Sequence, residues 1–389
     1  MTLPLQGVRV LDLSRLLPGP YCSQMLADFG ADVVKLEDVE RGDYLRDFPP
    51  CGERWSVLYD SVNRNKRSIT IDLKQEAGKA VFRDLVRQYD VLIEGFRPGV
   101  MDKLGLGYES LREINPRLIY CAITGYGQDG PYKFQGGHDI NYLSFAGITG
   151  LFGEQDGNPA MGDIQIADIG GGALMAVIGI LLALQARSVT GRGQFCDISM
   201  LDGVVSWLPF ILAKFGAGEK PVRGTGLLGG SYACYQIYPT ADGRYLSLGA
   251  LEEKFWVGFC RLIGREEYID RQMDLAAQPE MIRSLQEMFR QQNQAYWIAF
   301  FAGQDICLSP VNDLAQVLED PQIRHRRMIV PMAEETSTLL LTGIPIKLSD
   351  TPGQIQTGSP AQGEHTRQIL AEAGYSDAAL ARLAEQKII

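Results

Sequence analysis

The sequence is poor in histidine and has no paired cysteine motif. Only three histidines occur in 389 residues, and the seven cysteines lack the Cys-x-x-Cys spacing of zinc or redox sites. Positive charge is also scarce: the net charge of −10 argues against general nucleic-acid binding, which needs a basic surface to neutralise phosphates. These shortages predict a metal-free cytoplasmic protein that binds no nucleic acid.

Long apolar runs are scarce as well. The most apolar stretch, residues 173–186, lies between Asp168 and Arg187 and is shorter than the roughly 20 residues that cross a bilayer. Residues 5–13 are typical of a first strand rather than of a signal peptide. We therefore expect a short buried helix at 173–186 and no membrane partner.

The first third of the chain alternates between strand-like and helix-like segments. This alternation predicts an α/β fold with a mostly parallel sheet, covered by helices on both faces. Ligands are then expected at the carboxyl ends of the strands, near residues 13–15, 94–97 and 124–126. The predicted strands are 8–13, 32–36, 68–72, 91–94 and 118–123, and the predicted helices are 21–29, 76–88 and 110–114.

The sequence changes in character after about residue 210. A glycine-rich segment at 216–230 is followed by a predicted hairpin around Ala241-Asp242-Gly243 and then by helices. Because 389 residues exceed the size at which single cores stop growing, we expect two domains. We place a large domain at 1–210 and 325–389 and a smaller one at 211–324.

The segments Gly137-His138-Asp139 and Asp168-Ile169-Gly170-Gly171-Gly172 indicate catalysis most strongly. An α/β fold can bring their imidazole and carboxylate together. Such a pair can remove a proton from one face of a carbon and return it to the other. A lone carboxylate can instead attack an activated acyl group. Asp168 also suits a plain helix N-cap, and His138 suits a plain surface or core position.

Other charged residues and glycines add to this candidate site. Arg97 and Lys103 flank Pro98-Gly99 at the end of a predicted strand, where paired cations clamp phosphates. The run Asn63-Arg64-Asn65-Lys66-Arg67 adds positive charge and points to an anionic cofactor with several phosphates. Glu252 opens the helical part of the smaller domain, where an acid also simply favours the helix dipole. The three glycines after Asp168 are expected to let a bulky ligand approach the main chain.

Several runs in order along the whole chain resemble the class III (CaiB/BaiF-type) CoA-transferase superfamily. The resemblance implies a Rossmann-like large domain built from both chain ends, a smaller central domain and an interlocked homodimer. It also implies an acyl-CoA substrate, with coenzyme A as the cofactor and no metal. The runs are Pro18-Gly19-Pro20, 28–35 (DFGADVVK), 94–100 (EGFRPGV), 168–172 (DIGGG) and 190–194 (TGRGQ).

This resemblance also assigns residues. It places the catalytic aspartate at Asp168 and implies CoA contacts at Gly95, Arg97 and Lys103. Where relatives often have arginine, this chain has Asp38, and Arg41 is the nearby candidate to replace that cation. The expected CoA-binding set is completed by Lys66 and Arg67.

The run 137–142 (GHDINY) resembles the 2-methylacyl-CoA racemase branch, in which histidine and aspartate are paired acid and base. It implies α-proton transfer through an enolate by His138 and Asp168, with Glu252 paired to the histidine and Asp139 in support.

Two alternatives stay open. Where racemases show Asp-Gly-Gly-Ala-Pro, this chain has residues 229–233 (GGSYA), which also resemble the mobile loop of the transferases. A CoA-transferase with Asp168 as nucleophile is therefore the second hypothesis. A non-catalytic CoA-binding protein is the third, and the intact Asp168 and cationic loop argue against it.

Overall fold

The structure is a computed structural model that describes residues 2–52, 54–332 and 339–389. The chain forms two compact units, one of Met1–Ala146, Asp163–Trp207 and Gln322–Ile389 and the other of Gly147–Gly162 and Leu208–Pro321. The unit boundaries after Trp207 and Pro321 lie within about three residues of those placed from the sequence, but residues 147–162, which were assigned to the large domain, group with the second unit. Arg223 holds them there by donating hydrogen bonds to the carbonyls of Glu154, at 3.0 Å, and Gly157.

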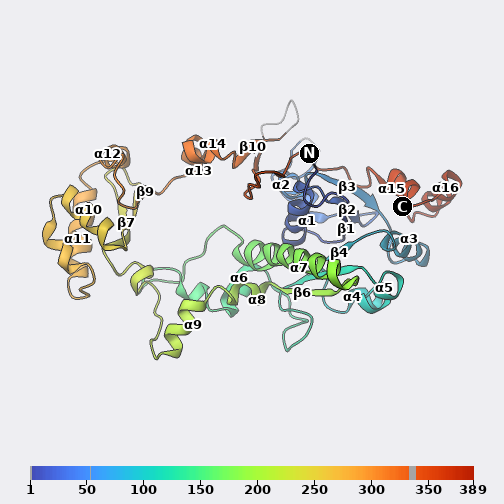
Figure 1. Ribbon diagram of the computed structural model, residues 1–389, viewed down its shortest axis with the longest axis horizontal. Helices are drawn as coiled ribbons and strands as arrows, with labels where there is room; N and C mark the ends of the chain where they lie inside the picture. The colour runs from blue at the N-terminus through green and yellow to red at the C-terminus, as the bar shows by residue number, and fades with distance from the viewer. Residues whose placement is uncertain (1, 53, 333–338) are drawn as a thin grey trace. The chain divides into compact units, whose positions relative to one another are not determined.

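A six-stranded sheet forms the centre of the first unit (Figure 1). Its order is β3-β2-β1-β4-β5-β6, and every neighbouring pair is parallel, which confirms the predicted α/β class. The central strands are near-continuous apolar runs, as burial on both faces requires. The strands are β1 (Arg9–Asp12), β2 (Asp32–Glu37), β3 (Lys66–Thr70), β4 (Val91–Glu94), β5 (Ile119–Thr124) and β6 (Phe195–Ser199).

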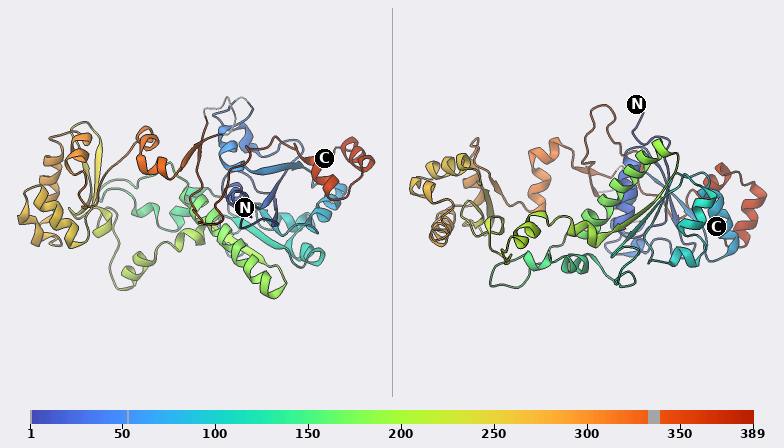
Figure 2. Two further views of the ribbon diagram at one scale, coloured as in Figure 1. Left: turned by 45° about the horizontal axis from the view of Figure 1, so that its top comes forward. Right: turned by 60° about the horizontal axis from the view of Figure 1, so that its bottom comes forward.

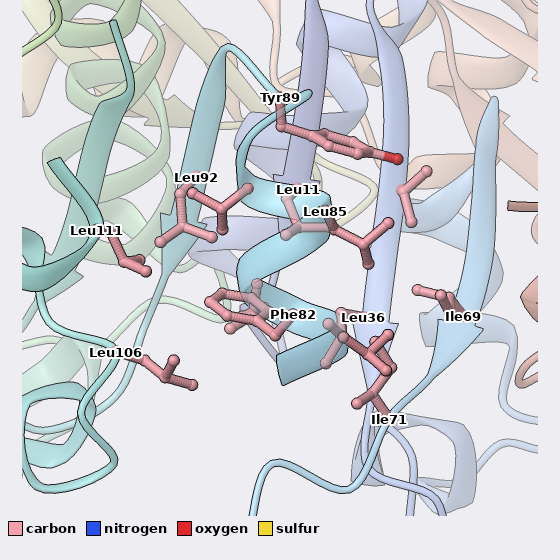
Figure 3. Close-up of a cluster of buried hydrophobic side chains, with 14 of the residues drawn as sticks. Leu11, Leu36, Ile69, Ile71, Phe82, Leu85, Tyr89, Leu92, Leu106 and Leu111 are labelled. Carbon is pink, nitrogen blue, oxygen red and sulfur yellow. The ribbon is translucent and has the colours of Figure 1, made fainter. Parts of the chain in front are cut away.

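Helices cover both faces of this sheet (Figure 2). One face packs against α1 (Pro18–Asp28) and α7 (Leu174–Thr190). On the other face, Phe82 and Leu85 of α3 contact Leu11, Leu36 and Leu92 of the strands (Figure 3). This second layer consists of α3 (Glu76–Val86), α5 (Tyr108–Ile114), α15 (Thr366–Glu372) and α16 (Asp377–Glu385).

The helix after Asp168 is longer and less buried than the sequence predicts. Together with the π-helix η3 (Ala167–Ala173), α7 forms a helix over Ala167–Thr190 of 24 residues that is long and apolar enough to cross a membrane. Half of its most apolar window is buried inside the protein, however. The expectation of a short, buried helix was therefore wrong in both length and burial, because its outer side exposes Ile178, Leu181, Leu182 and Val189.

Short helices connect the strands of the first unit or follow them. Those closest to the candidate site are α6 (Asp139–Phe145) and α8 (Met200–Val205). The others are η1 (Tyr44–Asp47), α2 (Val57–Asn63) and α4 (Val100–Lys103), and a hairpin of β10 (Ile329–Pro331) and β11 (Leu340–Thr342) lies near the C-terminal part.

The second unit has its own core. The predicted hairpin is confirmed as β7 (Tyr235–Pro239) and β8 (Tyr245–Gly249), joined by a turn in which Gly243 takes a φ of 73°. The apolar core is built around Trp256, Phe259 and Phe289. The other elements are η2 (Thr149–Leu151), α9 (Pro209–Gly216), η4 (Leu227–Gly229), α10 (Glu253–Leu262), η5 (Glu266–Arg271), α11 (Gln278–Phe289), α12 (Gln294–Phe300), β9 (Leu308–Pro310) and α13 (Leu314–Glu319), followed at the boundary by α14 (Pro321–His325).

Candidate active site

A cavity of about 650 Å³ opens in the first unit at the carboxyl ends of β1, β4 and β5. Ligands were expected at this edge of the sheet, because the ends of parallel strands meet there. Both His138 and Asp168 line the cavity, together with Gly95, Arg97 and Tyr142. The fold therefore brings together the two residues whose pairing the sequence left open.

Asp168 is the second residue of η3 and is half-buried. It is not the helix N-cap, because that position belongs to Ile166. A π-helical turn is rare and is frequently found at functional sites. The plain capping role considered for Asp168 does not apply.

The glycines after Asp168 serve packing rather than ligand access. A Cβ added to Gly170 would lie 2.1 Å from the Trp207 ring, and one added to Gly171 would lie 2.5 Å from the carbonyl oxygen of Met200. All three glycines are buried. The expectation that a ligand approaches the main chain here was wrong, because α8 and Trp207 occupy that space.

Asp139 holds the start of the helix that carries Asp168. Its Oδ1 accepts hydrogen bonds from the main-chain N–H groups of Ala167, at 2.5 Å, and Asp168, at 3.0 Å. These N–H groups belong to the first turn of a helix, where no intrahelical partner exists. Asp139 thus joins the segment next to His138 to the segment of Asp168.

The pKa of Asp168 lies closer to neutral pH than that of an ordinary aspartate. Burial, and after it the nearby charge of Asp139, raise the pKa of this carboxyl to about 6, while His138 acts in the opposite direction. A carboxyl with a pKa near the working pH can both take and give a proton. The effect of His138 on this pKa also indicates that imidazole and carboxylate lie within electrostatic range of each other.

His138 lies at the N-cap of α6, with an exposed side chain. Its main-chain N–H donates to Oδ1 of Asn141 at 3.0 Å. A larger residue in place of the preceding Gly137 would displace a tyrosine, because its Cβ would lie 2.8 Å from both the Tyr126 hydroxyl and the Tyr142 ring. The Tyr142 hydroxyl also donates to the carbonyl of Gly137 at 2.6 Å, so tyrosines fix the turn that presents the imidazole to the cavity.

Of the predicted CoA-binding cations, Arg97 lines this cavity. Its Nη2 would lie 3.2 Å from a Cβ on Gly136, close to His138. Lys103, at the end of α4, is exposed and outside the cavity lining. The sequence analysis missed Lys133, which does line the cavity, because it stands in an irregular segment with no motif around it.

Lys66 and Arg67 lie elsewhere, and the structure gives them internal partners. Lys66 Nζ is fully buried, 3.4 Å from Asp12 Oδ2, and donates to the carbonyl of Pro20 at 2.9 Å. Arg67 forms ion pairs of 2.8 Å with Asp32 and Glu372. Their predicted placement in the CoA site was wrong, because carboxylates of the fold occupy these cations.

A second cavity, of about 520 Å³, adjoins the first and shares Leu13, Ser14, Arg15, Phe96 and Val100 with it. The predicted candidate Arg41 lines this second cavity.

Asp38 also lines the second cavity. It accepts the N–H groups of Glu40 and Arg41 at 3.0 Å each. Its carboxylate lies 3.8 Å from Nζ of Lys74, so the cation nearest to this position comes from the loop after β3.

Glu252 belongs to the second unit, where it is the N-cap of α10 without a side-chain capping bond. Its pairing with His138 stays a prediction.

Across residues 2–52, 54–332 and 339–389, no group of three or more His, Cys, Asp or Glu side chains is arranged to hold a metal ion.

Comparison with known proteins agrees with this geometry. The sequence model of CoA-transferase family III matches residues 5–366. The chain belongs to CoA-transferase family III. It is therefore an enzyme of a family whose members include acyl-CoA racemases and CoA-transferases.

Individual relatives fall into both groups. An alpha-methylacyl-CoA racemase of Homo sapiens is 37% identical over 388 residues, which cover 99% of this chain and 97% of the relative. A succinyl-CoA:glutarate CoA-transferase of Mus musculus is 33% identical, covering 98% of this chain and 89% of the relative. Among solved structures, a CaiB/BaiF family protein from Brucella suis superposes with a TM-score of 0.85 at 34% identity, covering 96% of this chain and all of the other.

Proposed function

We propose that this family III protein racemises 2-methylacyl-CoA thioesters by moving the α-proton. The observation that carries the proposal is that His138 and Asp168 line one cavity, with the pKa of Asp168 raised to about 6. The imidazole takes the α-proton from one face, which leaves an enolate, and protonated Asp168 returns a proton to the other face. The reverse reaction exchanges these roles, and Glu252 paired with His138 would fix the imidazole tautomer.

The second candidate is CoA transfer through Asp168. In that reaction the carboxylate attacks the thioester carbonyl, releases CoA as a thiolate and then receives CoA back as an aspartyl thioester. A pKa of about 6 favours it, since Asp168 is then mostly ionised at neutral pH. The transferase relative at 33% identity supports it as well.

Isotope exchange separates the two reactions. Incubation of the wild type with one stereoisomer of a 2-methylacyl-CoA in deuterated water should place deuterium at the α-carbon and yield both stereoisomers. Loss of about 10⁴-fold in rate is expected for His138→Ala and for Asp168→Asn. His325→Ala, an exposed histidine of the same unit, is the matched control and should keep full activity.

The transferase gives the opposite pattern. The racemase would be refuted by two results together. The wild type would place no deuterium at the α-carbon, and the His138→Ala variant would still exchange CoA between two carboxylic acids. Hydroxylamine should then inactivate the enzyme only when acyl-CoA is present and only when Asp168 is intact.

The assembly and cellular location are further parts of the proposal. A homodimer with interlocked chains would cover the apolar side chains that α7 exposes, Ile178, Leu181, Leu182 and Val189, which are unusual on a monomer surface. Light scattering should then give twice the 43.0 kDa chain mass. Seven unpaired cysteines support a reducing, cytoplasmic location.

A further inference from the structure

Arg15 lies where the two cavities of the first unit meet, and it lines both. Its guanidinium lies 5.1 Å from the ring centre of Phe96 and 5.6 Å from that of Tyr44. No ion pair or side-chain hydrogen bond joins it to any residue of the described ranges. Two aromatic rings lie beside its donors, and the carboxylate of Asp38 in the second cavity lies within electrostatic range of it.

The main chain on both sides of Arg15 is fixed by buried charges. The N–H of Leu16 donates to Asp43 Oδ1 at 3.3 Å, and Leu16 itself has a φ of 63°, which a leucine adopts only under constraint. On the other side, Nζ of Lys35 donates to the carbonyl of Ser14 at 2.9 Å. Lys35 and Asp43 form a fully buried ion pair of 2.9 Å.

These buried charges have no part in proton transfer at Asp168. Burying an ion pair contributes little net stability, and the left-handed residue costs free energy as well. What the arrangement achieves is a fixed main chain at residues 14–16, from which the exposed Arg15 side chain extends. A guanidinium that extends from this fixed main chain to a cavity junction, with no ion pair of its own in the described residues, is suited to binding an anion.

We propose that Arg15 binds the diphosphate of the CoA moiety, at the point where the ligand passes from the Asp168 cavity into the second cavity. This inference rests on the proposed acyl-CoA substrate. The planar guanidinium matches two phosphate oxygens at once. Arg97 and Lys133 line the first cavity alone, and Arg41 and Lys74 line the second alone. Arg15 is the cation that lines both, so it is the one placed at the junction.

The test is calorimetric binding of CoA, 3′-dephospho-CoA and pantetheine at constant salt. Arg15→Gln should weaken CoA and 3′-dephospho-CoA equally, by about 10- to 100-fold, and leave pantetheine unchanged. Arg15→Lys should recover part of the loss, because it keeps the charge without the fork. Arg112→Gln is the control, since Arg112 lies on α5, where it pairs with Glu109 and lies over the Tyr108 ring, and it lines neither cavity.

Three results would overturn the assignment. Equal weakening of pantetheine would show that Arg15 only shapes the cavity. A loss confined to CoA would assign Arg15 to the 3′-phosphate instead, and unchanged binding of all three ligands would exclude any phosphate contact. Wild-type protein that binds CoA but exchanges no α-proton would refute the racemase alone, while wild-type protein that binds no CoA would refute both proposals.

Discussion

Two groups of carboxylates lie at the carboxyl end of the same sheet. One group is paired with cations, which we call compensated, and the other is not. Asp12 and Glu37 are buried and paired with cations, at 3.4 Å from Lys66 and 2.7 Å from Arg46. Asp168, Asp139 and Glu94 belong to the active-site side, and none of them has an ion-pair partner among residues 2–52, 54–332 and 339–389.

The two groups consequently titrate in opposite directions. Burial favours the neutral form of Asp12, but Lys66 and Lys35 outweigh it and lower the pKa of that carboxyl. At Asp168 and Glu94 no lysine or arginine opposes burial, and the pKa rises to about 6 and about 7, with His138 the one cationic side chain that acts against the rise at Asp168. The compensated charges therefore hold the loops in place, whereas Asp168 and Glu94 can exchange protons near neutral pH.

Breaking the compensated group should have the largest effect on stability. Lys35→Met removes the buried cation between Asp43 and Asp12 and leaves their charges in the interior. We expect the free energy of unfolding to fall by about 3–5 kcal/mol at pH 7, measured by denaturant titration. The position of Arg15 should be lost too, so the affinity for CoA should fall even where the variant is folded.

Lys74→Met is the matched control for this substitution. It breaks the 3.8 Å pair with Asp38, but the Lys74 side chain is 78% exposed. Its removal should cost less than about 1 kcal/mol. Similar losses for both lysines would contradict the distinction between compensated interior charges and surface charges.

The sequence predicted most strands of the sheet and missed one at its edge. The parallel sheet followed from apolar strands alternating with amphipathic helices, and 91–94 matches β4 to the residue. β6 was missed because its edge sequence, Phe195-Cys196-Asp197-Ile198-Ser199, is short and only partly buried.

The cations were harder to assign than the strands. A run of positive residues shows its charge but not its partners, and Arg67 binds Glu372, which lies 305 residues along the chain. Arg15 has no such run around it. Its position after β1 was the available indication, because the carboxyl ends of parallel strands form ligand sites.

The uncompensated group can be tested at Glu94, which is 5% exposed and accepts the N–H of Phe96 at 2.6 Å. A carboxyl whose pKa is raised in the folded state loses stability as pH rises from its ordinary value, 4.5, to about 7, and the loss is complete above that. Glu94→Gln keeps the acceptor without the charge. At pH 8 its free energy of unfolding, measured by denaturant titration, should exceed that of the wild type by about 1–2 kcal/mol. At pH 4 the two free energies of unfolding should be equal.

Asp197→Asn provides the comparison for Glu94. Burial raises the pKa of Asp197 as well, but this carboxylate is an exposed acceptor for the N–H of Gln128. Its substitution should therefore change stability by a few tenths of a kcal/mol. A pH-independent gain for Glu94→Gln would mean that packing rather than ionisation distinguishes the two side chains.

The smallest expected effect concerns Asp139, whose charge and hydrogen bonds act on Asp168 in different ways. Asp139→Asn keeps an oxygen to accept the N–H groups of Ala167 and Asp168, but it removes the negative charge that helps to raise the pKa of Asp168. That pKa should fall toward its ordinary value. In the direction in which Asp168 takes the α-proton, the acid limb of kcat/KM should move to lower pH, and the rate at pH 5 relative to pH 8 should rise about threefold.

Asp139→Ala separates the charge from the hydrogen bonds. It removes both, so it should show the same displacement of the acid limb together with a lower kcat/KM at every pH, because the first turn of η3 loses its acceptor. If Asp139→Asn left the acid limb in place while Asp139→Ala lowered kcat/KM, Asp139 would act only by holding the helix. The acidity of Asp168 would then follow from its burial alone, and the uncompensated group would consist of independent carboxyls rather than of an interacting pair.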